Sequence, residues 1–207
     1  PISVITTQSE YGKDDTSSIE EARNIFKIIF KETKKMSILV SQLLTLARMD
    51  KGRQKLKIEE VEIGELIEIA VEGQRTYANS KNIKIIPNIK ENIYSSVDET
   101  MIMRVFTNLL SNAISYGKEN GYVKISLNRD DNNVIIKIED NGIGISEDNL
   151  EKIWIRFFQV DPSRSTENSG LGLSMVKGII ESHKGSVSVE SVLNKGTIFT
   201  IYLPLSK

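Results

Sequence analysis

The sequence predicts an α+β fold, in which a mixed β-sheet carries helices on one face, preceded by a separate helical segment. Three observations lead to this prediction. Residues 19–47 carry one long apolar seam, residues 123–127 and 134–140 have the pattern of neighbouring strands, and residues 187–203 have that of a closing hairpin. With 39% hydrophobic residues in 207, the chain has enough apolar side chains for a sizeable core.

Composition excludes several classes of function. The 27 basic and 28 acidic residues leave a net charge of −1, which argues against a nucleic-acid partner recruited by bulk charge. Without Cys there are no disulfides or thiolate metal sites, and a single His, His183, leaves no His-rich metal site. No apolar run approaches the ~20 residues of a membrane helix. Because residue 1 is Pro rather than Met, we expect a processed chain or a piece of a longer one.

The first 52 residues are predicted to form a helical domain. Apolar positions in 19–47 alternate three and four residues apart, which is typical of a helix packed against another helix, so we favour dimerisation over a solitary amphipathic helix. Ser17 and Glu20 fit a capping box at its start, and Asp50 to Gly52 fit its end. Residues 1–10 are predicted to form a short helix.

Residues 53–207 alternate helix and strand patterns. Asp98 is a suitable N-cap for a helix that ends at Tyr116. The other predicted helices are 63–78, 147–156 and 173–182; the predicted strands are 83–89, 93–97, 123–127, 134–140, 187–191 and 197–203. Residues 157–169 are polar and without periodicity, and are predicted to form a flexible loop.

Three segments have residue types suited to binding a nucleotide. Asn108 and Asn112 lie four residues apart on one helix and can offer oxygens to Mg²⁺. Asp140 ends a buried strand and is followed by Gly142 and Gly144, so a carboxylate stands where a ligand can approach the backbone. Residues 169–174 place glycines at the start of a helix, where amides suit phosphate oxygens. Each segment taken alone fits an ordinary turn or helix boundary better.

Taken together and in this order, the segments resemble the catalytic region of bacterial sensor histidine kinases. Residues 108–113 (NLLSNA) look like that family's N box and residues 140–145 (DNGIGI) like its first glycine box. Residues 153–161 resemble the F box, 170–173 (GLGL) the second glycine box and 195–197 (KGT) the closing glycine motif. Residues 43–50 look like the end of the second helix of the family's dimerisation bundle.

The resemblance implies the ATP-binding sandwich fold of gyrase-type, chaperone and mismatch-repair ATPases, with ATP and Mg²⁺ as cofactors. It implies that Asp140 accepts a hydrogen bond from the adenine amino group and that Asn112, with Asn108 beside it, holds Mg²⁺. The same family pattern implies that residues 157–169 form a lid. The remaining residues implied to bind nucleotide are Tyr116, Gly142, Gly144, Gly170, Leu171 and Gly172.

Hydrolysing relatives place a Glu four residues before the metal-binding Asn, as general base for water, whereas this chain has Asn108. An amide cannot take the proton, so phosphoryl transfer is favoured over hydrolysis. Ser115, Gln159 and Asn168 depart from residues that the family often has, the first two being a Lys and an Arg. Arg164, in the predicted lid, is our candidate for the missing positive charge, with a solvated loop cation as the alternative.

His183 is expected to be structural, since it falls at a helix end before the final hairpin. Pro1-Ile2 matches the end of the family's acceptor motif, so the phosphoacceptor His is expected upstream of residue 1.

The resemblance thus implies a kinase core whose parent, a membrane sensor and homodimer, phosphorylates its own His and passes the phosphate to a response-regulator Asp. This chain should bind Mg-ATP without phosphorylating itself. The alternatives are a degenerate ATP-binding scaffold and a stand-alone ATPase.

Overall fold

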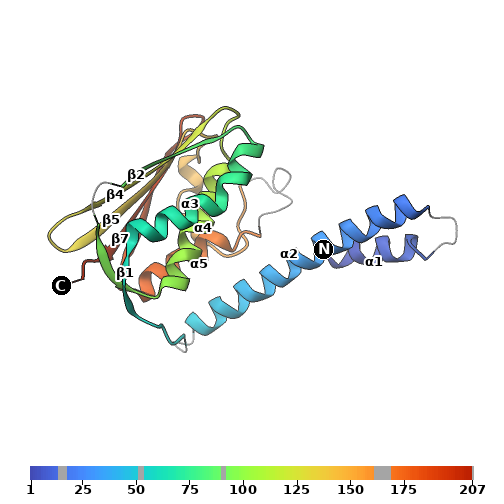
Figure 1. Ribbon diagram of the computed structural model, residues 1–207, viewed down its shortest axis with the longest axis horizontal. Helices are drawn as coiled ribbons and strands as arrows, with labels where there is room; N and C mark the ends of the chain where they lie inside the picture. Colours follow the sequence, from blue (N-terminus) through green and yellow to red (C-terminus); the bar gives the residue numbers. More distant parts are fainter. Residues whose placement is uncertain (14–17, 51–53, 90–91, 161–168, 207) are drawn as a thin grey trace. The chain divides into compact units, whose positions relative to one another are not determined.

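The computed structural model describes residues 1–13, 18–50, 54–89, 92–160 and 169–206, and the chain divides into two compact units, residues 1–52 and 53–207 (Figure 1). Arg164, Asn168 and Ser17 lie outside the described residues, as does most of the predicted lid. Within the described part of the chain, no helix is both long and apolar enough to cross a membrane.

The first unit consists of two helices, α1 (Ile2–Tyr11) and α2 (Ile19–Asp50), which pack against each other. The capping box forms one residue later than the sequence predicts. The Glu21 amide donates to the Ser18 hydroxyl over 3.1 Å, and the Ser18 amide donates to the Glu21 carboxylate over 2.8 Å. Both Ser-x-x-Glu frames fit the rule, and the one that begins directly before Ile19 is used.

Part of the apolar seam on α2 is exposed. Phe26 is 69% exposed and Val40 52%, whereas Ile25 is buried. Ile19, Phe30, Leu43 and Leu44 are exposed as well. Such a stripe is typical of a helix face that awaits a partner.

The second unit has a five-stranded sheet in the order β2-β4-β5-β7-β6, with β2 and β4 parallel and the other neighbours antiparallel (Figure 1). Its strands are β2 (Lys84–Ile89), β4 (Tyr122–Arg129), β5 (Asn133–Asp140), β6 (Ser186–Val192) and β7 (Gly196–Pro204). A separate antiparallel pair joins β1 (Glu59–Glu62), which the sequence did not predict, to β3 (Tyr94–Val97). The predicted α+β class with a mixed sheet is confirmed.

Three helices cover one face of the five-stranded sheet: α3 (Ile63–Ser80), α4 (Glu99–Ser115) and α5 (Gly172–Ser182) (Figure 1). Strand residues alternate accordingly, so Val134, Ile136 and Ile138 of β5 are buried while Lys137 is exposed. The predicted N-cap is confirmed, since the Asp98 carboxylate accepts from the Met101 amide over 3.0 Å.

The helix predicted over 147–156 is wrong. The segment forms two short 3₁₀ turns, Glu147–Asn149 and Lys152–Trp154. Ile153 is the one residue of the segment that is fully buried. Leu150 and Trp154 stand at helical spacing with Ile153 but are only half-buried, so packing against the core does not sustain a longer helix.

Candidate functional site

The Asp140 carboxylate lies at the end of β5 and is only 8% exposed. It accepts a 2.8 Å hydrogen bond from the Gly142 amide and another from the amide of Thr197, its register partner on β7. Burial raises the pKa of this carboxyl above its usual value, and the two amides oppose the shift. Asp140 is therefore an acidic group held in a largely desolvated position, ready to accept from a ligand's donor.

The loop after Asp140 is fixed to the end of α4. The Ile143 amide donates to the carbonyl of Tyr116 over 3.1 Å. A Cβ on Gly142 would stand 2.3 Å from that same carbonyl oxygen, so only glycine fits there. Gly144 faces the β6–β7 hairpin, where the Val192 carbonyl lies. The structure thus brings together four of the sequence-predicted site residues: Asp140, Gly142, Gly144 and, through its backbone, Tyr116.

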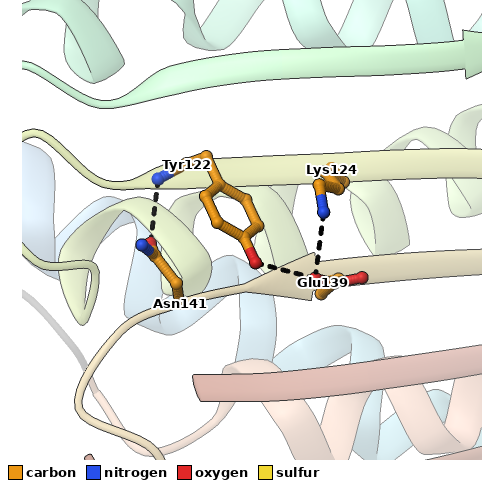
Figure 2. Close-up of polar contacts among 4 residues, drawn as sticks. All are labelled: Tyr122, Lys124, Glu139 and Asn141. Carbon is orange, nitrogen blue, oxygen red and sulfur yellow. Dashed lines mark hydrogen bonds and ion pairs between the residues drawn. The ribbon is translucent and has the colours of Figure 1, made fainter. Parts of the chain in front are cut away.

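Figure 2 shows how the loop and the adjoining strands are tied together. The Asn141 side-chain oxygen accepts from the Tyr122 amide over 2.9 Å, and the Tyr122 hydroxyl donates to Glu139 over 2.9 Å. Lys124 reaches the same Glu139 oxygen at 3.4 Å and lies 4.4 Å from the centre of the Tyr122 ring. These contacts hold the start of β4 beside the residue that follows Asp140.

Asn108 and Asn112 lie on α4, as predicted, but differ in their bonding. The Asn108 amide nitrogen donates to the Arg104 carbonyl over 2.8 Å, which leaves its oxygen as the available group. That oxygen faces the start of α5, because a Cβ on Gly172 would lie 3.1 Å from it. Among the described residues, none forms a hydrogen bond with the Asn112 carboxamide. The Asn108 oxygen is therefore available at the start of α5, and Asn112 lies one helical turn further along α4.

The start of α5 has amides without a side-chain cap. Leu171, the N-cap residue, contributes no side-chain hydrogen bond, and its own side chain is fully buried. Its amide donates to the Ser169 hydroxyl over 3.3 Å, so a ligand at this position would compete with that hydroxyl. The uncapped first turn of a helix attracts anions, because its amides point outward and the helix dipole is positive there. The first residue of α5, Gly172, thus lies against Asn108, and Gly170 and Leu171 directly precede it.

These residues fit a bound nucleotide with a metal ion. In the described part of the chain no group of three or more acidic, His or Cys side chains could hold a metal by itself. A hard cation would instead take the oxygens of Asn108 and Asn112 and complete its shell with phosphate oxygens and water.

The contacts of Ser115, at a position where the family often has Lys, could not be predicted from the sequence. Its hydroxyl lies 3.0 Å from the hydroxyl of Tyr77, and its carbonyl accepts from the Lys81 ammonium over 3.2 Å. Both partners belong to the end of α3 or the residue after it. A cation thus reaches position 115 from a segment more than thirty residues away.

His183 has the structural role that the sequence predicted. It is 5% exposed, its Nδ1 lies 2.8 Å from the Ile179 carbonyl, and its Nε2 accepts from the Asp98 amide over 2.9 Å. Both ring nitrogens are engaged within the protein.

Comparison with known proteins agrees with this geometry. Residues 97–207 match the family described as Histidine kinase-, DNA gyrase B-, and HSP90-like ATPase. The sensor protein RprX of Bacteroides fragilis is 34% identical over the whole chain, which covers 41% of RprX. The chain spans half or less of the length of the curated relatives that it matches.

Solved structures give the same result. The Acinetobacter baumannii histidine kinase AdeS aligns with a TM-score of 0.83 at 26% identity, covering 100% of this chain and 96% of AdeS. Histidine kinase ThkA, solved in complex with the response regulator protein TrrA, aligns with a TM-score of 0.78 at 26% identity, covering 100% of this chain and 58% of ThkA. The chain therefore belongs to the histidine kinase-, gyrase B- and HSP90-like ATPase family, as the catalytic domain of a bacterial sensor histidine kinase with a helical segment before it.

Proposed function

We propose that this chain is the Mg-ATP-binding kinase core of a two-component sensor histidine kinase. The observation that carries the proposal is the buried Asp140 carboxylate, which stands beside a glycine loop. The side-chain oxygen of Asn108 on α4, opposite the uncapped start of α5, supports it. A parent protein would transfer the ATP γ-phosphate to its own His, upstream of residue 1, and then to a response-regulator Asp.

Asp140 reads the base. Its carboxylate accepts a hydrogen bond from the exocyclic amine of adenine, whereas guanine would present an oxygen to it. Two acceptors facing each other in a desolvated site cost ~1–3 kcal/mol, or more when one is charged. Asp140 thereby selects ATP over GTP.

Asn112 and the oxygen of Asn108 hold Mg²⁺, and the first-turn amides of α5, with Gly170, Leu171 and Gly172, bind phosphate oxygens. Tyr116 lines the site at the end of α4, and Arg164, which lies outside the described residues, is our candidate for an added positive charge. When bound, ATP supplies the phosphoryl group, and Mg²⁺ neutralises part of the negative charge on the phosphates.

Asn108 favours transfer over hydrolysis. A general base that activates water is typically worth ~10²–10⁴ in rate, and a carboxamide whose nitrogen is already bonded to Arg104 cannot serve as one. The phosphoryl group therefore awaits a nucleophile from another segment, which is the function of a kinase rather than an ATPase.

The partners follow from the same assignment. ThkA binds a response regulator, and this chain is similar enough to propose a cognate regulator for its parent. The exposed apolar seam of α2 supports a homodimer of the parent. The parent is proposed to be a membrane sensor, with this portion in the cytoplasm.

The test supplies γ-labelled ATP to the whole chain, with and without a separate helical bundle that carries the family's acceptor His. We expect Mg-ATP binding, no label on the chain, and slow labelling of the bundle, since the effective concentration of a tethered acceptor is lost. Label on His183 would contradict its structural role. Confirmed ATP binding without any transfer would favour a scaffold, and steady phosphate release would favour an ATPase.

A further inference from the structure

Two contacts fix α5 against α4, one at each end. At one end the His183 ring meets the backbone of Asp98; at the other, Gly172 meets the Asn108 oxygen. The helices are therefore antiparallel. Asp98 and Asn108 are ten residues apart and Gly172 and His183 eleven, which separates the two contacts by about 15 Å at 1.5 Å per residue.

The contact at the far end is specific and buried. Since Nε2 of His183 accepts the Asp98 amide proton, the ring is neutral there and carries its proton on Nδ1, which donates to the Ile179 carbonyl. Asp98 is the N-cap of α4, so its amide is not used in the helix's own ladder. Its carboxylate is also occupied, by the amides of Met101 and Lys57.

Between the two contacts the helices meet through apolar residues. Those buried on α5 are Met175, Val176, Ile179 and Ile180, and the buried residues of α4 between Asp98 and Asn108 are Ile102, Val105 and Phe106. Apolar contact is non-directional and tolerates small axial shifts of one helix along another. A hydrogen bond from a fixed amide to a ring nitrogen does not tolerate them, because its strength falls steeply with angle.

We propose that His183 is a positioning residue for the phosphate end of the nucleotide site. By accepting the Asp98 amide it sets the axial register of α5 against α4, and so the distance from the first turn of α5 to the oxygens of Asn108 and Asn112. The inference rests on the proposed function, because it concerns the same site. It assigns His183 no contact with nucleotide.

The experiment measures affinities of the whole chain for Mg-ATP and for adenosine, which has no phosphate, by calorimetry at a temperature where every variant is folded. His183→Leu removes both hydrogen bonds, while His183→Gln keeps an acceptor near the position of Nε2. Ser182→Ala is the matched control. The Ser182 hydroxyl donates to the same Ile179 carbonyl over 2.7 Å and lies 3.4 Å from Nδ1 of His183, so its removal changes only the Nδ1 side of the ring and leaves the Asp98 contact intact.

We expect His183→Leu to weaken Mg-ATP about fivefold or more, within the usual range of coupling between distant positions, and adenosine less than about twofold. His183→Gln should recover most of the loss, and Ser182→Ala should behave as wild type. Equal weakening of adenosine and Mg-ATP would reduce His183 to a purely structural residue and overturn the proposal.

A double-mutant cycle with Asn108→Ala adds a second readout. If His183 acts through the register sensed at Asn108, its effect on Mg-ATP should shrink in the Asn108→Ala background, although sites this far apart normally add. An additive cycle would refute the proposal even if all variants fold. Failure of the wild-type chain to bind Mg-ATP would instead refute the proposed function, so the two failures are distinguishable.

Discussion

The Phe157 amide donates a 2.9 Å hydrogen bond to the carbonyl of Gly170, and both residues have left-handed backbone conformations, with φ of 64° and 70°. For a residue with a side chain, such as Phe157, this conformation costs roughly 1–2 kcal/mol. The contact joins Phe157, in the middle of the F-box segment, to the residue two positions before α5. Described segments from both sides of residues 161–168 therefore meet directly beside the proposed phosphate site.

Replacing Gly170 by Ala should disturb this junction. The new Cβ would lie 2.6 Å from the Phe157 carbonyl carbon at a φ that L residues avoid, so we expect a loss of at least about 1–2 kcal/mol of stability and weaker Mg-ATP binding. Gly73→Ala is the control. Gly73 lies within α3, a Cβ added there would have no neighbouring atom within 4 Å, and the variant should be more stable by about 0.5–1 kcal/mol. Chemical denaturation and titration measure both. An unchanged Gly170→Ala variant would contradict the strain argument.

Asp140→Asn should abolish most ATP binding while the fold survives. Wild-type protein should prefer ATP to GTP by at least about tenfold, because guanine leaves the carboxylate without a donor. Calorimetric titration with the two nucleotides checks both statements. Equal affinities for ATP and GTP in the wild type would refute the role of Asp140.

The same variant has a pH signature without nucleotide. The folded-state pKa of Asp140 is raised by burial, so its contribution to stability is fully present below the unfolded pKa and is lost as pH rises through the folded pKa. At neutral pH Asp140→Asn should therefore be more stable than wild type. Thermal melts should show the difference narrowing as the pH is lowered toward 4.

Asp130 should behave in the opposite sense. It lies in the β4–β5 turn, and hydrogen bonds from the amides of Asn132 and Asn133 lower the pKa of its carboxyl. The contribution of Asp130 to stability is present above its pKa in the unfolded state and is lost as the pH falls through its pKa in the folded state. We expect Asp130→Ala to lower the melting temperature at pH 7, with the difference vanishing in acid and ATP affinity unaffected. A pH-independent difference would exclude the carboxylate as its cause.

Asn112→Ala should weaken Mg-ATP by about tenfold or more, yet change metal-free nucleotide binding little, since loss of groups that support a metal site typically costs 10–100-fold. Thr107→Ala, on the exposed side of α4, is the matched control. Titrations with Mg²⁺ and with EDTA separate the two cases. If Mg²⁺ makes no difference to wild-type affinity, the metal role of Asn112 is wrong.

Self-association of this chain should be weak, because α1 spans 10 residues against 32 in α2 and offers little surface for a four-helix dimer core. Sedimentation at several concentrations should show mostly monomer or a concentration-dependent mixture. Phe26→Ser should shift the equilibrium further toward monomer. Ile69→Ser, which replaces another exposed apolar side chain, on α3, should not. A tight dimer at nanomolar concentration would contradict this expectation.

Local signals made most of the fold predictable. Asp98 begins α4 as a cap three residues from its bonding partner, and strand alternation located β4 and β5. The prediction of a helix over residues 147–156 was wrong because the sequence pattern of a short segment with little burial does not distinguish an α-helix from 3₁₀ turns. Strand β1, with the sequence EEVE, carries almost no apolar signal and depends on pairing with β3, more than thirty residues away.

In the site, too, residues within local motifs were predictable and contacts from distant segments were not. Asp140, the asparagines and the glycines stand in compact motifs, so sequence alone was enough to propose them as site residues. Partners supplied by distant segments could not be named: the Thr197 amide on Asp140, and Lys81 at Ser115. The hydrogen bond from the Asn108 side-chain nitrogen to the Arg104 carbonyl could not be predicted either. It leaves the side-chain oxygen as the available polar atom of Asn108.

The position of β5 has a consequence for local opening. Asp140 ends a strand that is hydrogen-bonded on both sides, to β4 and β7, so its amide and those around it should exchange with deuterium only on global unfolding. The first turn of α5 has no such ladder and no side-chain cap. We therefore expect the half of the site proposed to bind the base to open only with the whole domain, and the half proposed to bind phosphate to open and reclose many times within the lifetime of one folded molecule.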